Sequence, residues 1–150
     1  MSTATTSSAT ATGIDPRGAR FAAALTSVVL ALVLVTPRPL SVFLLAVQAG
    51  VFAVGATRGV QHTPYAVVFR RLVRPRLGPP AELEDARPPR FAQTVGLVFV
   101  GVGLVGFLAG SPVVALLATG LALVAALLNA TVGLCLGCEM YLILRRATAR

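Results

Sequence analysis

The sequence predicts an all-α, polytopic membrane protein with four transmembrane helices, arranged as two tandem hairpin repeats with short interfacial helices. The 150-residue chain is 56% hydrophobic and only 12% charged, which is too few charges to cover a soluble domain of this size. Four segments are apolar over the length that a spanning helix requires, about 20 residues. The basic residues lie almost entirely outside these segments. This composition excludes an ordinary soluble enzyme, a disordered chain and a disulfide scaffold.

The predicted spans cover residues 20–36, 40–56, 91–109 and 113–132. Turn residues separate the two members of each hairpin: Pro37 and Pro39 in the first, and Gly110, Ser111 and Pro112 in the second. No segment alternates apolar and polar residues as a membrane barrel strand does. Because backbone groups in lipid must be paired within the segment, helices are the remaining choice. We expect residues 14–150 to form a single membrane domain.

The arginines predict the orientation of the spans. All 13 basic residues are arginines, and only Arg38 lies in one of the two short hairpin turns. The other twelve precede or begin the first span, follow the last one or lie in the connection formed by residues 57–90. Because basic residues close to span ends favour the cytoplasm, we predict a multi-pass inner (plasma) membrane protein embedded in the lipid bilayer. Its N- and C-termini and the 57–90 connection are then cytoplasmic.

Two segments outside the spans have a distinctive composition. Residues 1–13 form a Ser/Thr/Ala-rich tail that we expect to be disordered. The tail lacks the positive n-region of a signal peptide, so we interpret the first span as an uncleaved anchor. The 57–90 connection is basic, and the Pro79-Pro80 and Pro88-Pro89 pairs are expected to keep it extended. It suits anionic lipid or a cytoplasmic partner, whereas nucleic acid is not expected because interleaved aromatic residues are missing.

The chain repeats itself. Asp15-Pro-Arg-Gly-Ala-Arg-Phe-Ala22 recurs as Asp85-Ala-Arg-Pro-Pro-Arg-Phe-Ala92, and each copy precedes a predicted hairpin. After each hairpin a tyrosine, Tyr65 or Tyr141, is followed by an apolar run and an arginine pair. The halves, residues 15–76 and 85–146, therefore have the same topology and should be related by an axis along the membrane normal.

The repeat also interprets the apolar run over residues 113–144, which as one helix would be longer than the hydrocarbon core. By analogy with the first half, the fourth span is expected to end near residues 133–137. Residues 141–146 would then form a short interfacial helix. The alternative is a single tilted helix, which would bury the cysteines more deeply.

The most specific motif is Cys135-Leu136-Gly137-Cys138, which contains both cysteines of the chain. Three-residue spacing in a helix or turn brings the sulfurs to one side, as reversible disulfide formation or half of a metal site requires. On the cytoplasmic side a permanent disulfide is disfavoured. We hypothesise that Cys135 and Cys138 are a redox pair; close packing of small residues is the alternative. No metal or cofactor is expected, since zinc takes about four ligands and only His62 and acidic residues remain.

Three polar residues are further candidates. His62, the only histidine, lies in the half-one counterpart of the cysteine region. If the halves face each other, it could lower a thiolate pKa; otherwise it is a solvated loop residue. Gln48 and Asn129 lie inside spans, where amides either bond between helices or line a path for a small substrate.

Four stretches together resemble the DUF4395 family of small bacterial membrane proteins, common in actinobacteria. They are the motif beginning at Asp15, the segment 65–76, the motif containing Asp85, and Asn129-Ala-x-x-Gly-x-Cys-x-Gly-Cys-Glu-x-Tyr141. The resemblance covers residues 14–146. Members of this family have no established activity and tend to be encoded beside thioredoxin-like and rhodanese-type sulfurtransferase genes. The resemblance therefore implies thiol redox or sulfur handling rather than metal binding.

Three functions remain open. In the first, the cytoplasm-facing pair Cys135/Cys138 exchanges electrons or sulfane sulfur with a soluble thioredoxin-like or rhodanese-type partner, whereby one cysteine attacks and the other resolves the mixed intermediate. In the second, the protein is a non-catalytic anchor or scaffold that docks such an enzyme on its arginine-rich face. In the third, it is a small transporter subunit with Gln48 and Asn129 along the path, for which 150 residues would require a homo-oligomer.

Overall fold

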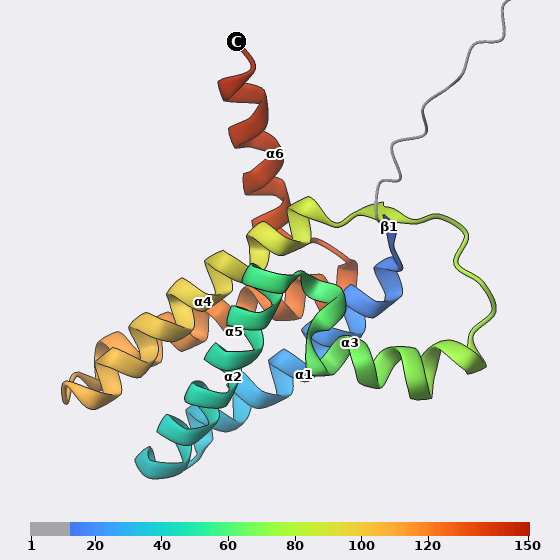
Figure 1. Cartoon of the computed structure of the whole chain (residues 1–150). Coiled ribbons are helices and arrows are strands. Elements are labelled where there is room, and N and C mark those ends of the chain that lie inside the picture. Colours follow the sequence, from blue (N-terminus) through green and yellow to red (C-terminus); the bar gives the residue numbers. More distant parts are fainter. Residues whose placement is uncertain (1–12) are drawn as a thin grey trace, which may run out of the picture.

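The structure, a computed structural model, describes residues 13–150 and is dominated by a bundle of four long helices (Figure 1). These helices are α1 (Pro16–Val35), α2 (Arg38–Arg58), α4 (Arg87–Leu108) and α5 (Pro112–Val132). Each is long and apolar enough to cross a membrane, with a mean hydropathy of 2.0 to 2.3 over its most apolar stretch. The predicted fold class, all-α with four apolar spans, is confirmed.

Shorter elements follow each hairpin at the same end of the bundle. After α2 come η1 (Val60–His62), α3 (Pro64–Val68), the π-helical turn η2 (Phe69–Val73) and η3 (Arg74–Arg76), which together we call the 60–76 arm. After α5 comes α6 (Leu136–Thr148), which leaves the bundle at a steep angle to the long helices (Figure 1). The strands β1 (Gly13–Ile14) and β2 (Glu84–Asp85) pair antiparallel at this end. The tail predicted to be disordered lies outside the described residues, except for Gly13 in β1.

The N-termini of α1 and α4 explain why both helices begin earlier than the predicted spans. Asp15 caps α1 by accepting a hydrogen bond from the Arg17 amide, which pairs an otherwise free donor of the first turn. The prolines Pro88 and Pro89 lie in the first turn of α4, where a missing amide proton costs no helical hydrogen bond. The prediction that Pro88-Pro89 extends the connection is therefore wrong. The Pro79-Pro80 pair does lie outside the helices.

The break after the fourth span is confirmed. Helix α5 ends at Val132, and Gly133 has a left-handed conformation with φ of +74°. The amides of Gly133 and Leu134 donate to the carbonyls of Asn129 and Leu128, which closes the helix end. Helix α6 then begins at Leu136, five residues before the predicted interfacial helix. A single tilted helix through this region is excluded.

The two halves pack in a two-fold arrangement. Helix α1 packs against α5, and α2 packs against α4; exchanging the halves converts the first contact into the second. In the β1–β2 ladder Ile14 faces Glu84, and these residues occupy the same place in the two copies of the repeated motif. The ladder therefore lies on the axis that relates the halves. The two-residue strands themselves were not predicted.

Aromatic contacts correct one detail of the repeat. Phe21 of α1 packs against Phe69, and its counterpart Phe91 of α4 packs against Tyr141, both with ring centroids 5.7 Å apart. Phe69, rather than Tyr65, is therefore the structural counterpart of Tyr141. The phenol of Tyr65 instead donates a 2.7 Å hydrogen bond to the buried side chain of Gln48. Matching Tyr65 to Tyr141 places the repeat one helical turn too early, because a phenylalanine fills in the first half the position that a tyrosine fills in the second.

Candidate functional site

The cysteine pair lies where the chain turns from α5 into α6. Cys135 is the N-cap of α6, and its Sγ accepts a 3.3 Å hydrogen bond from the Cys138 amide. The two sulfurs are joined as a disulfide, with 5.2 Å between the Cα atoms. Both side chains belong to residues that are partly exposed. The pair is therefore at the surface, at the amino end of a 13-residue helix.

Two residues of α6 seat this turn against α4. A Cβ added to Gly137 would lie 2.6 Å from the Cα of Ala92, so the two backbones approach closely only because Gly137 has no side chain. One turn further along α6, Tyr141 packs on Phe91. Gly137 and Tyr141 thus fix the first turn of α6, and with it the cysteines, on the amino end of α4.

Two arginines, one in each half of the repeat, donate hydrogen bonds across the halves. Each bonds to the C-terminal end of the second long helix of the other half. Arg20 of α1 donates to the carbonyls of Ala130 and Thr131 at the end of α5, directly before the cysteine turn. Its repeat counterpart Arg90 donates to the carbonyls of Ala56 and Thr57 at the end of α2. A guanidinium at a helix C-terminus pairs free carbonyls and opposes the negative end of the helix dipole. The repeated motif signals these arginines, but the sequence does not reveal that they bond across the halves.

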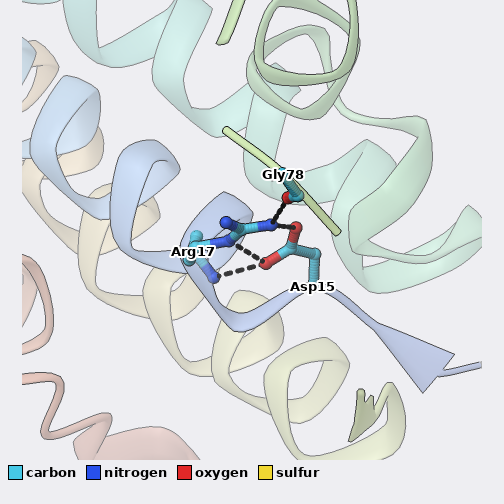
Figure 2. A network of polar contacts seen from close by, with 3 residues as sticks. All are labelled: Asp15, Arg17 and Gly78. Carbon is cyan, nitrogen blue, oxygen red and sulfur yellow. Dashed lines mark hydrogen bonds and ion pairs between the residues drawn. The ribbon is translucent and has the colours of Figure 1, made fainter. Parts of the chain in front are cut away.

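The repeated aspartates form matching ion pairs at the same end. Asp15 pairs with Arg17 and Asp85 with Arg87, each at 2.9 Å. Figure 2 shows that Arg17 also donates to the carbonyl of Gly78, 3.0 Å away, which ties α1 to the segment after the 60–76 arm. The Arg87 hydrogen bond holds the pKa of Asp85 below its usual value, and Arg145 of α6 adds to this effect. Arginines from two helices, α4 and α6, thus act on the same carboxyl at this end of the bundle.

The Asp15–Arg17 pair predicts an acid-sensitive contribution to stability. The Arg17 hydrogen bond holds the pKa of the Asp15 carboxyl below its usual value of 3.8. Because the folded-state pKa is lowered, the pair stabilises the fold above the ordinary pKa, and this contribution is lost as the pH falls through the lowered value. We expect Asp15→Asn to reduce the fall in melting temperature between about pH 5 and about pH 2, measured by thermal denaturation in detergent.

The matched control for this prediction is Asp85→Asn. The Asp85 side chain is 43% exposed, against 8% for Asp15, and exposed ion pairs contribute little because water screens them. The acid dependence should therefore change less in Asp85→Asn than in Asp15→Asn. Equal acid dependence in the wild type and in Asp15→Asn would contradict the assignment.

A family model described as "Domain of unknown function (DUF4395)" matches residues 14–146. The chain belongs to this family. In this DUF4395 protein the matched region contains both halves of the repeat, the 60–76 arm and the cysteine turn, and it ends within α6. No curated protein and no solved structure matches the sequence.

The other candidate residues of this DUF4395 protein lie on η1, on α2 and in the last turn of α5. His62 is exposed in η1, and within residues 13–150 no three His, Cys, Asp or Glu side chains gather as a metal site would require. Gln48 is fully buried and bonds to Tyr65 and, at 3.4 Å, to Thr26. Asn129 is partly exposed, and its backbone carbonyl accepts a hydrogen bond from the Gly133 amide. The structure thus brings the two cysteines together and leaves His62 outside their group.

Proposed function

We propose that this protein is a membrane thiol-redox or sulfur-handling component whose reactive group is the pair Cys135 and Cys138. One observation carries the proposal: two sulfurs in bonding contact occupy the accessible amino end of a helix at the charged end of the bundle. Structural cysteines are usually buried in apolar surroundings and inert, whereas reactive ones are partly exposed in positive surroundings. The partners proposed for it are soluble thioredoxin-like or rhodanese-type proteins.

The position of Cys135 favours it as the attacking cysteine. The free amides of the first turn of α6 point toward the N-cap, and a thiolate there is stabilised by hydrogen bonds and by the helix dipole. The Cys138 amide already donates to the Cys135 Sγ. Lowering the pKa of a thiol raises its thiolate fraction at neutral pH, which is the form that attacks. Cys138, one turn along α6, then acts as the resolving cysteine.

The proposed exchange begins at a disulfide of the partner protein. The Cys135 thiolate attacks a disulfide of the partner, forms a mixed disulfide and releases one partner thiolate. The Cys138 thiolate attacks the Cys135 sulfur, which forms the Cys135–Cys138 disulfide and releases the second partner thiolate. Two electrons pass to the partner, and the protons lost by the two cysteines are available to its thiolates. With a persulfide partner, the Cys135 thiolate instead accepts the terminal sulfur atom and the partner leaves as a thiolate.

A redox titration of the purified full-length protein tests this proposal. The protein is equilibrated in detergent with dithiol buffers of graded potential, quenched with acid and alkylated. Mass spectrometry then gives the fraction of protein that carries the alkyl groups, which is the reduced fraction at each potential. A single two-electron transition between about −180 and −300 mV is expected, the range in which cellular dithiol proteins exchange. The double variant Cys135→Ser/Cys138→Ser is the control and should show no transition. A disulfide that stays oxidised well below −300 mV would identify a structural bond and contradict the proposal.

The alternative function, a non-catalytic anchor, is favoured by a different observation. The 60–76 arm and α6 both carry exposed arginines, which suit an acidic soluble protein. They are Arg70 and Arg71 on the arm, and Arg145 and Arg146 on α6. The two functions separate in pull-downs from membranes. An anchor loses its partner in Arg70→Ala/Arg71→Ala and keeps it in Cys135→Ser/Cys138→Ser, whereas the redox function gives the reverse.

A further inference from the structure

An open groove at the charged end of the bundle has a composition that the thiol chemistry does not use. It is a shallow hollow of about 350 Å³, largely open to its surroundings, between α1, the 60–76 arm with the adjoining Leu77, and the end of α5. Arg17 and Arg20 contribute its polar lining, and five apolar side chains complete the wall: Phe21, Phe69, Val73, Leu77 and Ala130. The groove therefore combines guanidinium groups with an apolar wall at one place.

The charges in the groove leave one cation to be neutralised. Arg17 is paired with Asp15, so together they carry no net charge. Arg20 bonds only to the neutral carbonyls of Ala130 and Thr131, and no carboxylate pairs with it within residues 13–150. A guanidinium has five N–H donors, and a single Nη of Arg20 makes both of these bonds. The groove is therefore suited to one singly charged anion with several acceptor oxygens.

The surface of α1 beyond Arg20 indicates where the rest of such a ligand lies. Positions 20, 24, 28 and 32 follow one another along one face of a helix, and Val28 and Leu32 are 58% and 43% exposed. On the neighbouring α5, Leu127 is 44% exposed. An apolar surface thus runs from the groove along a candidate span, toward the position that hydrocarbon would occupy.

We propose that this groove binds the phosphodiester headgroup of an anionic phospholipid. Arg20 donates to the phosphate, the apolar wall covers the glycerol backbone, and the acyl chains follow the exposed face of α1. Within residues 13–150, Arg20 is the one groove arginine that no carboxylate pairs, and the single negative charge of a phosphodiester matches it. In phosphatidylcholine the choline cation cancels that charge, so a lipid with net negative charge is preferred. A free phosphate offers the same oxygens but nothing to cover the apolar wall. A bound lipid would brace the Arg20 contact that ends α5 directly before the cysteine turn.

Native mass spectrometry of the full-length protein tests the site with three probes: dioleoyl phosphatidylglycerol, dioleoyl phosphatidylcholine and inorganic phosphate. Phosphatidylglycerol is expected to bind more tightly than phosphatidylcholine, and millimolar phosphate is expected not to displace it. Arg20→Gln should weaken phosphatidylglycerol binding about tenfold, as the loss of a hydrogen bond between charged groups does. Leu77→Glu, which places a negative charge in the wall and keeps Arg20 and its bonds to the end of α5, should weaken it at least as much.

Matched controls separate this site from a general effect of charge. Arg76→Gln removes the same charge as Arg20→Gln from an exposed residue outside the groove. Leu72→Glu adds the same charge as Leu77→Glu to an exposed leucine of the 60–76 arm that does not line the groove. Both should bind phosphatidylglycerol like the wild type. Equal losses in Arg76→Gln and Arg20→Gln, unchanged binding in Leu77→Glu, or equal affinity for phosphatidylcholine would overturn the proposal. Displacement of the lipid by inorganic phosphate would assign the groove to a free anion instead and overturn it as well.

Discussion

Replacing Cys138 by serine is expected to trap Cys135 in a mixed disulfide with a soluble dithiol protein. Cys135 caps α6, where helix amides stabilise its thiolate, and Cys138 lies one turn along the helix with its amide bonded to the Cys135 sulfur. Without the resolving sulfur, the intermediate formed by attack of Cys135 cannot collapse to the internal disulfide. Non-reducing electrophoresis of acid-quenched membranes, followed by mass spectrometry of the shifted band, detects the trapped partner.

The reciprocal variant is the control for this experiment. Cys135→Ser removes the attacking sulfur and keeps Cys138, so the shifted band is expected to fall about tenfold or more, because one turn along the helix fewer amides stabilise the thiolate. A dithiothreitol-treated sample of Cys138→Ser should lose the band completely. Equal trapping by both single variants would contradict the assignment of Cys135 as the attacking cysteine and Cys138 as the resolving one. Trapping by neither variant would contradict thiol exchange and favour the anchor function.

Replacing Gly137 by alanine is expected to destabilise the protein and expose the cysteines, although the same replacement in a helix normally stabilises. A Cβ at this position would lie 2.6 Å from the Cα of Ala92 on α4, so α6 must move away from α4. Overpacking of this kind costs about 1–3 kcal/mol. Thermal denaturation in detergent should show a lower melting temperature, and the reduced cysteines should react faster with a bulky maleimide.

Gly120 provides the matched control for Gly137. It lies within α5, and a Cβ added there would meet nothing within 4 Å. Gly120→Ala should therefore gain up to about 1 kcal/mol of helix propensity and leave the maleimide rate unchanged. The two substitutions are chemically identical and are expected to have opposite signs. A stabilised Gly137→Ala variant would show that α6 does not pack against α4 as described.

The sequence predicts those parts of the fold that depend on composition and on repetition. Apolar length identifies the four spans, and the repeat of the motifs at Asp15 and Asp85 identifies the two halves and the break near Gly133. These features can be predicted because a segment that crosses lipid must be a long apolar helix, and because the two halves share one sequence motif. Arginine and proline in the first turn make a helix start look polar and irregular. Proline nevertheless costs no helical hydrogen bond there, and the first arginine of each helix pairs with the aspartate two residues before it.

The candidate site could be predicted only in part. Two cysteines three residues apart are local information, so their proximity was predictable. The bonds of Arg20 to the end of α5 and the contact of Gly137 with Ala92 join residues that are distant in the sequence. Such contacts depend on how the halves dock, which the pattern of a single sequence does not specify. For the same reason the sequence could not decide that His62 lies outside the cysteine group.

Differential alkylation of Cys135 and Cys138 reports both the membrane face and the redox state of the pair. Spheroplasts and inverted membrane vesicles are treated with a membrane-impermeant maleimide, before and after reduction, and labelling is compared with that of Cys135→Ser/Cys138→Ser. We expect both cysteines to be labelled only in inverted vesicles and only when they are reduced, and we expect a mild oxidant to block the labelling by forming the disulfide. Labelling from the outer face alone would contradict a cytoplasm-facing pair. Labelling that is unchanged after treatment with the oxidant would contradict a redox pair.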